Sequence, residues 1–220
     1  MQYDVVEDLA PISLLTRSPI LITARKDFPA NNLNELIAWL KANPGKATVA
    51  TVGRGSAGHV SSFYFGSATG TRFAFVPYRG GGPAIQDELA GHVDLMFNEG
   101  TGALPYLLSG QIKVYAVLAK RRWFAAPHIP AIAELGISGV EISFWHGLWV
   151  PKGTPQEITS RLNAAVVEAL SDPTVRERLT AIGQEIFPRE EQTPEALYAF
   201  HKAEIEKWWP IIRAAGTGGE

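Results

Sequence analysis

A glycine-rich turn between a short strand and a helix, within residues 47–65, most constrains what this chain can fold into. Residues 48–52 are small or β-branched, which favours a strand. Three glycines follow where the backbone must turn sharply: Gly53, Gly55 and Gly58. Ser56 is a good N-cap for the helix that comes next. The first amides of such a helix have no internal partners and, with the helix dipole, they favour a carboxylate or a phosphate.

A second copy of this layout follows the first. Residues 73–77 predict a strand, residues 78–82 a glycine-rich turn, and Pro83 the first residue of a helix. Two such units in succession predict neighbouring parallel strands. Open α/β sheets bind ligands beyond the carboxyl ends of such strands.

Strands and helices alternate over residues 20–118, which predicts a self-contained α/β lobe. Residues 12–15 and 20–24 read as two strands separated by a polar break at residues 16–19. After residue 118 helices predominate, with a short one predicted at residues 131–135 and too few strands for a separate sheet. We therefore expect three segments: residues 1–19 as a remnant of one lobe and the crossover, 20–118 as the α/β lobe, and 119–220 as the mostly helical remainder of the first lobe.

Composition excludes several classes of protein. Lys and Arg number 20 and Asp and Glu 22, so charge gives no reason to expect nucleic acid or an anionic membrane as a partner. The chain has no cysteine, and its five histidines show no metal-ligand spacing. We expect neither a metal nor another cofactor.

The glycines of the first turn also satisfy a dinucleotide fingerprint, Gly53-x-Gly55-x-x-Gly58. No Asp or Glu ends the next strand to hold a ribose, but Arg79 could bind a 2′-phosphate, so an NADP-dependent enzyme stays an alternative. Ser56 and His59 would share a helix face, yet no nucleophile signature surrounds them. We interpret them as an N-cap and a polar lining, and we predict that the protein is not an enzyme.

Several stretches together resemble the substrate-binding receptors of tripartite tricarboxylate transporters, the Bug receptors. They are GRGSAGH, VPYRGGGPAIQDELAGHVDLMF, LSGQIKVYAVLAKRR and FWHGLWVPKGTP, and the resemblance runs from about Leu9 to Gly216. It implies a two-lobed type II periplasmic-binding-protein fold and a periplasmic location. It also implies a small carboxylate as ligand, delivered to a membrane permease.

Carried over to this sequence, the resemblance implies a carboxylate site on the first turn. The backbone amides expected to hold the carboxylate are those of Gly53, Gly55, Ser56 and Ala57. Side-chain contacts would come from Thr51, Ser56 and His59. Tyr78, Arg79 and Gly80 on the second turn, and Asn98 at a strand end, would complete the wall.

The sequence departs from the family at its beginning. Receptors of this kind start with a signal peptide, an apolar strand and further glycine-rich turns, and we find no match for these. We therefore expect one complete α/β lobe and a partial, helix-rich second lobe, with weak carboxylate binding and a tendency to self-associate. A receptor repurposed as an interaction module, with the missing strands supplied by another chain, is the remaining alternative.

Overall fold

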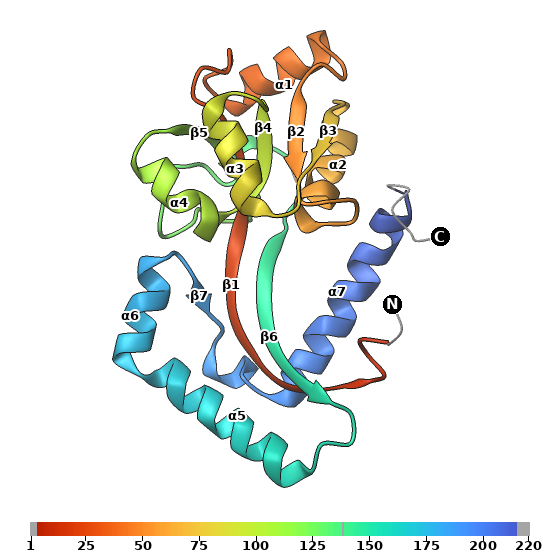
Figure 1. Cartoon of the computed structure of the whole chain (residues 1–220), viewed down its shortest axis with the longest axis vertical. Coiled ribbons are helices and arrows are strands. Elements are labelled where there is room, and N and C mark those ends of the chain that lie inside the picture. Colours follow the sequence, from red (N-terminus) through yellow and green to blue (C-terminus); the bar gives the residue numbers. More distant parts are fainter. Residues whose placement is uncertain (1–3, 138, 215–220) are drawn as a thin grey trace. The chain divides into compact units, whose positions relative to one another are not determined.

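A computed structural model describes residues 4–137 and 139–214 (Figure 1). The chain divides into two compact units. Unit 1 comprises the residues up to Ser18 together with Trp145–Pro210, and unit 2 comprises Pro19–Phe144 and the residues after Pro210. Both units contain strands and helices, which confirms the predicted α/β class.

Five strands follow one another across the main path of the sheet in the order β3-β2-β4-β1-β5. They are β1 (Leu9–Arg25), β2 (Thr48–Thr51), β3 (Ala74–Pro77), β4 (Leu95–Glu99) and β5 (Ile112–Val117). Strand β2 is parallel to both β3 and β4, with Val49 opposite Phe75 and Leu95, whereas β1 is antiparallel to β4 and β5. The predicted parallel pairing of the strands before the two glycine-rich turns is confirmed.

The helices of unit 2 cover both faces of this sheet. They are α1 (Leu33–Ala42), α2 (Ala57–Thr69), α3 (Gly81–Ala90) and α4 (Gly100–Leu108). Met96 of β4 packs with Ile85 of α3, and Tyr106 of α4 joins the same cluster, so α3 and α4 share a face. Phe97 turns the other way, its ring 5.6 Å from that of Phe65 on α2. Helix α2 thus covers one face of the sheet, and α3 and α4 cover the other. Each of these three helices begins directly after one of the parallel strands.

The predicted break at residues 16–19 is wrong, because β1 runs through it as one strand of 17 residues. Thr16 and Arg17 pair with β7, and Ile20–Ala24 pair with β4. The polar side chains that suggested a break have partners instead: Thr16 Oγ1 lies 3.2 Å from His146 Nδ1, and Arg17 donates to Glu185. The break in sequence pattern therefore marks the place where one strand changes its neighbours.

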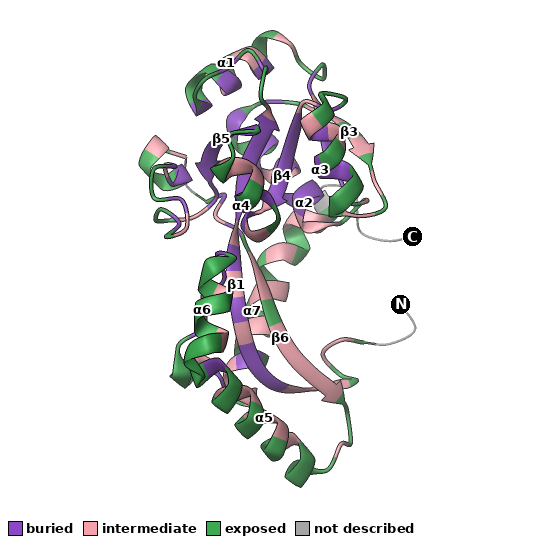
Figure 2. Ribbon diagram, turned by 60° about the vertical axis from the view of Figure 1, so that its left-hand side comes forward, coloured by how far each residue is buried: buried purple, intermediate pink, exposed green. Residues whose placement is uncertain are grey.

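Unit 1 has fewer strands and a smaller core. Its elements are β6 (Ser143–Pro151), α5 (Gln156–Ser171), α6 (Pro173–Ala181), β7 (Glu185–Ile186), the 3₁₀ turn Arg189–Glu191 and α7 (Pro194–Ala214), of which β6 and α7 extend a few residues into unit 2. Both β6 and β7 pair with β1, so the strands after residue 118 form no sheet of their own among the described residues. Leu14, Phe187 and Leu197 form the buried cluster of this unit, and Figure 2 shows α5 and α6 largely exposed.

Residues 119–144 belong to unit 2, whereas the sequence suggested a boundary at residue 118. Val117 bridges to Ala131, and the Ile142 amide donates to the Leu118 carbonyl at 2.9 Å. Trp123 is buried in the same cluster as Leu21. The short helix predicted at residues 131–135 is a 3₁₀ turn, Ile132–Leu135. The sequence of residues 119–144 lacks the hydrophobic periodicity of a helix or strand because its packing and hydrogen bonds are irregular.

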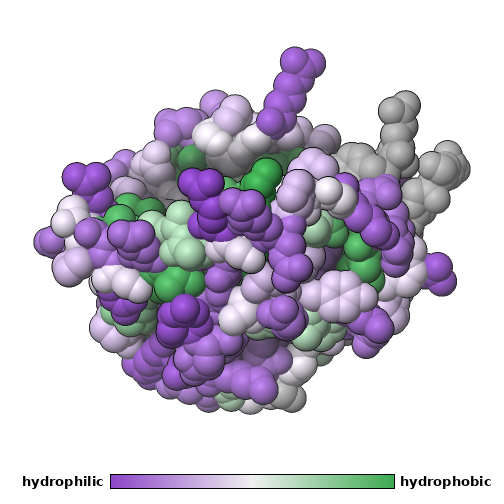
Figure 3. All heavy atoms as spheres, turned by 90° about the horizontal axis from the view of Figure 1, so that it is seen from below, coloured by the Kyte–Doolittle hydropathy of each residue, from purple (hydrophilic) through white to green (hydrophobic). Residues whose placement is uncertain are grey.

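Among the described residues, no helix combines the length and the hydropathy that a membrane span requires. The face drawn in Figure 3 is mainly hydrophilic, and its hydrophobic residues lie in separate groups. That face gives no support of its own to the expected self-association, which stays a prediction.

Candidate functional site

The candidate site lies in unit 2, where the parallel strands β3, β2 and β4 end and the helices α3, α2 and α4 begin. We call this the carboxyl edge. Since parallel strands end at the same side of a sheet, three helix N-termini come to one side of unit 2 (Figure 1). Each brings unpaired amides and the positive end of a helix dipole. Such an edge favours an anion.

The first turn has the conformation that its glycines predict. Gly53 and Gly55 have φ angles of 109° and 79°, a left-handed region that L-residues with side chains rarely adopt. The Ser56 amide donates to the Gly53 carbonyl at 3.3 Å, and the Gly55 amide donates to His59 Nδ1 at 3.4 Å. Two of the four amides expected to hold a ligand thus already have partners. The amides of Gly53 and Ala57 make no hydrogen bond with any described residue.

Three polar side chains surround this turn. Ser56 caps α2, because its Oγ accepts from the His59 amide, and this leaves the hydroxyl proton available to a ligand. Thr51 is 3% exposed, and its hydroxyl makes no hydrogen bond with the described residues. Its hydroxyl is not among the fully buried polar atoms that lack a partner, so it keeps some access and can bond to a ligand.

His59 is a neutral imidazole that helps to fix the turn. Burial, with a smaller contribution from Arg54, holds its pKa below the usual value of 6.5. Since Nδ1 accepts from the Gly55 amide, the ring proton lies on Nε2. The ring also packs edge-on against Phe75, with centroids 4.7 Å apart. His59 can therefore offer a hydrogen-bond donor but no charge.

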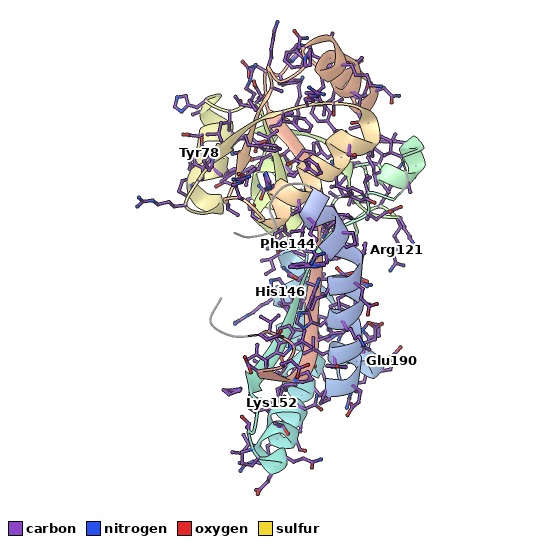
Figure 4. The ribbon with its side chains drawn as sticks, turned by 90° about the vertical axis from the view of Figure 1, so that its right-hand side faces the viewer. Tyr78, Arg121, Phe144, His146, Lys152 and Glu190 are labelled. Carbon is purple, nitrogen blue, oxygen red and sulfur yellow. The ribbon has the colours of Figure 1, made fainter. Side chains whose placement is uncertain are left out.

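The second turn brings its backbone, but not its tyrosine ring, to the carboxyl edge. The Tyr78 amide donates to the Thr51 carbonyl at 2.7 Å, which ties this turn to β2. The phenol donates to Asp87 Oδ2 at 2.6 Å, two turns into α3 (Tyr78 is labelled in Figure 4). Arg79 is exposed, and Gly80 precedes α3 without a side-chain cap. Tyr78 therefore anchors the turn to α3.

We predict that Asp87→Asn lowers the pKa of Tyr78. The hydrogen bond to the Asp87 carboxylate, followed by burial, raises that pKa to about 12 from 10.0. An amide at position 87 still accepts the bond but no longer repels the phenolate charge. A ¹³Cζ-tyrosine NMR titration would measure the shift. His92→Ala, which removes the other partner of Asp87, serves as the control and should move the Tyr78 pKa less; an equal shift would contradict this account.

Asn98 lies next to a third glycine-rich turn that the sequence analysis missed. It belongs to β4, is 8% exposed, and its side chain makes no hydrogen bond with the described residues. Gly100, Thr101 and Gly102 then form the first turn of α4, which has no side-chain cap. The signal was present in the sequence Glu99-Gly100-Thr101-Gly102 after an apolar strand, as at the other two turns.

The site offers neutral hydrogen-bond donors and no metal-binding chemistry. The described residues contain no group of three or more His, Asp or Glu side chains that could hold a metal ion. The carboxyl edge brings together Thr51, Ser56, Ala57, His59 and Asn98. The second turn contributes its backbone to this edge. Such an arrangement can bind an oxyanion through amides and hydroxyls, as charged side chains are not required for that.

Comparison with known proteins places this chain in a family. The family model described as "Tripartite tricarboxylate transporter family receptor" matches residues 1–217. Curated relatives are 34% and 31% identical over 98% and 96% of this chain, which spans 62% of their length.

Three solved structures show the same fold. The periplasmic binding protein BugD is 36% identical, with a TM-score of 0.88 over 95% of this chain and 70% of its own. Rpa4515 of R. palustris, solved with adipate, is 31% identical with a TM-score of 0.91. The match covers 98% of this chain and 71% of Rpa4515. MatC of Rhodopseudomonas palustris, solved with malate, is 34% identical with a TM-score of 0.87. The match covers 93% of this chain and 69% of MatC. The resemblance stated from the sequence is confirmed, and the chain belongs to the tripartite tricarboxylate transporter receptor family, with the periplasmic-binding-protein fold of the Bug receptors.

Proposed function

We propose that this chain binds a small carboxylate at the carboxyl edge of unit 2. In this proposal it acts in the periplasm as the solute receptor of a tripartite transporter and hands its ligand to a membrane permease. It is a receptor and not an enzyme. The observation that supports this most is the meeting of three helix N-termini beside Thr51, whose hydroxyl makes no hydrogen bond with the described residues.

The chemistry of the edge suits a carboxylate. The amide of Ala57 lies at the positive end of the α2 dipole, and the Ser56 hydroxyl and His59 Nε2–H add donors. Because Nδ1 accepts from the Gly55 amide, the Nε2–H of His59 stays available as a donor. Adipate and malate, bound by the two solved relatives, are both dicarboxylates. A dicarboxylate or similar organic acid is therefore the proposed ligand class.

The test is a change that stabilises the helix while it repels an anion. Ala57 is the first residue of α2, a position where an acidic side chain favours the dipole. Ala57→Asp should fold normally and should weaken carboxylate binding at least about tenfold, which corresponds to roughly 1.4 kcal/mol. NMR titration with adipate, malate, succinate and citrate measures this, because chemical shifts report dissociation constants up to the millimolar range.

The matched control is Gln156→Asp, since Gln156 is the exposed first residue of α5 in the other unit. It should leave carboxylate affinity unchanged. Failure of the whole panel to bind the wild type would overturn the proposal, and so would equal losses in both variants. Saturable NADP binding at this turn, in place of carboxylates, would favour the dinucleotide alternative.

A further inference from the structure

Asn98 has an unused hydrogen-bonding side chain that the carboxylate site on α2 does not explain. It is more than nine-tenths buried, yet neither its oxygen nor its nitrogen bonds to a described residue. Its polar atoms are not among the fully buried ones that lack a partner, so the amide keeps some access from outside the protein. A ligand group can take the place of solvent at this amide and bond to both of its polar atoms.

The position of Asn98 directs its amide toward α4. Side chains alternate along β4, so Asn98 shares the face of Met96, which packs against α3, and not that of Phe97, which packs against α2. Asn98 Oδ1 lies 3.7 Å from the point that a β-carbon on Gly102 would occupy. The absence of a side chain at Gly102 therefore leaves the approach to the amide open beside the first turn of α4.

Asn98 is also within reach of a small ligand held at α2. Ala50 of β2 lies opposite Met96 of β4, so Thr51 is level with Phe97 and Asn98 is one residue beyond it. Strand geometry places the Cα atoms of Thr51 and Asn98 about 6 Å apart, with their side chains on opposite faces of the sheet. A ligand that reaches both must pass over the ends of β2 and β4, and a four- to six-carbon acid with one carboxylate at α2 is long enough to do so.

We infer that Asn98, with the first turn of α4, forms a second subsite that takes a hydroxyl group of the ligand. The inference rests on the proposed function, which places the carboxylate at α2. A carboxamide presents both donors and acceptors, whereas a carboxylate only accepts. A hydroxyl can donate to Oδ1 and accept from Nδ2 together. The chain should therefore prefer a hydroxycarboxylate to the same acid without its hydroxyl.

Pairs of acids that differ by one hydroxyl test the inference: succinate and malate, glutarate and 2-hydroxyglutarate, and tricarballylate and citrate. For the pair that binds, the wild type should hold the hydroxy acid at least tenfold more tightly. In Asn98→Leu, the hydroxy acid should bind within threefold of the affinity that the same variant has for its counterpart. NMR titration gives both constants, and the spectrum shows whether the variant is folded.

Asn98→Asp separates hydroxyl recognition from general damage to the site. An aspartate still accepts a hydroxyl proton, so the preference should persist, while repulsion weakens both acids of a pair. Binding without a hydroxyl preference, or a preference that Asn98→Leu leaves intact, would overturn this inference and leave the proposed function standing. Failure of all six acids to bind would overturn both.

Discussion

At pH 8 the Glu88→Gln variant should be more stable than the wild type, and at pH 5 the two should be similar. Glu88 lies in α3, is fully buried, and has one carboxyl oxygen, Oε2, without a partner. Burial raises the pKa of Glu88 to about 8 from 4.5, and the hydrogen bond with Thr23 opposes this only in part. A glutamine is neutral at every pH, so its substitution removes this dependence.

The hydrogen bonds around Glu88 are compatible with a protonated acid as well as with a carboxylate that accepts from Thr23. Thr23 Oγ1 lies 2.7 Å from Glu88 Oε1 and 3.1 Å from the Met96 carbonyl. A hydroxyl has one proton, and the Met96 carbonyl can only accept. If Thr23 donates to Met96, the proton between Thr23 and Glu88 must come from Glu88. The Nε2–H of a glutamine can replace that donor, which is why the variant should keep the packing.

The direction of the effect follows from proton binding. Between pH 4.5 and 8 the folded protein holds the Glu88 proton and the unfolded chain does not, so stability falls as pH rises. The stabilisation is complete below pH 4.5 and is lost above about pH 8. Across that interval the free energy of unfolding should decrease by about 5 kcal/mol in the wild type relative to Glu88→Gln. Acids with lowered pKa values, such as Asp87 and Glu134, affect the wild type and Glu88→Gln alike. Their contributions therefore cancel in the difference between the two free energies of unfolding.

Urea unfolding at several pH values between 5 and 8.5 measures this difference, and hydrogen exchange of β1 and β4 amides assigns it to unit 2. Glu168→Gln, an exposed substitution on α5, serves as the control and should follow the wild type. Stability curves for Glu88→Gln and the wild type that run parallel across this range would show that Glu88 is ionised in the folded protein.

The elements of unit 2 were predictable wherever local signals agreed with the fold. Ser56 caps α2 as its sequence context predicts. The continuous strand β1 was not predictable, since only partners distant in sequence explain why polar residues around Arg17 stay extended. Pro83 was expected to begin α3 but is its third residue, because two glycines form the first positions.

The candidate site was predictable as a region more than as a set of side chains. The glycines at residues 53 and 55 predicted a sharp turn, and in the structure both have positive φ angles. The bond from the Gly55 amide to His59, and the turn of the Tyr78 phenol away toward Asp87, depend on tertiary packing that no local pattern encodes. The first turn of α4 could have been predicted, because it repeats the strand-glycine-helix pattern of the other two.

Gly58→Ala should destabilise unit 2 by about 1–3 kcal/mol and weaken carboxylate binding with it. A β-carbon at this position would lie 2.8 Å from the carbonyl oxygen of Phe97, closer than such contacts allow. That oxygen belongs to buried strand β4, where the Phe97 ring packs against Phe65 and Phe73, so it cannot move freely. The start of α2 must shift away from β4, and the amide of Ala57 and the Ser56 cap shift with it.

Gly81→Ala is the control, because Gly81 is the first residue of α3, does not precede a proline, and its β-carbon would meet nothing within 4 Å. Both substitutions gain up to about 1 kcal/mol of helix propensity, but only the one at position 58 meets the clash. Urea unfolding should therefore show destabilisation by Gly58→Ala alone, with Gly81→Ala neutral or stabilising. NMR titration of Gly58→Ala with the panel of acids should show the accompanying loss of affinity. Equal changes in stability for the two variants would mean that α2 approaches β4 less closely than the structure has it.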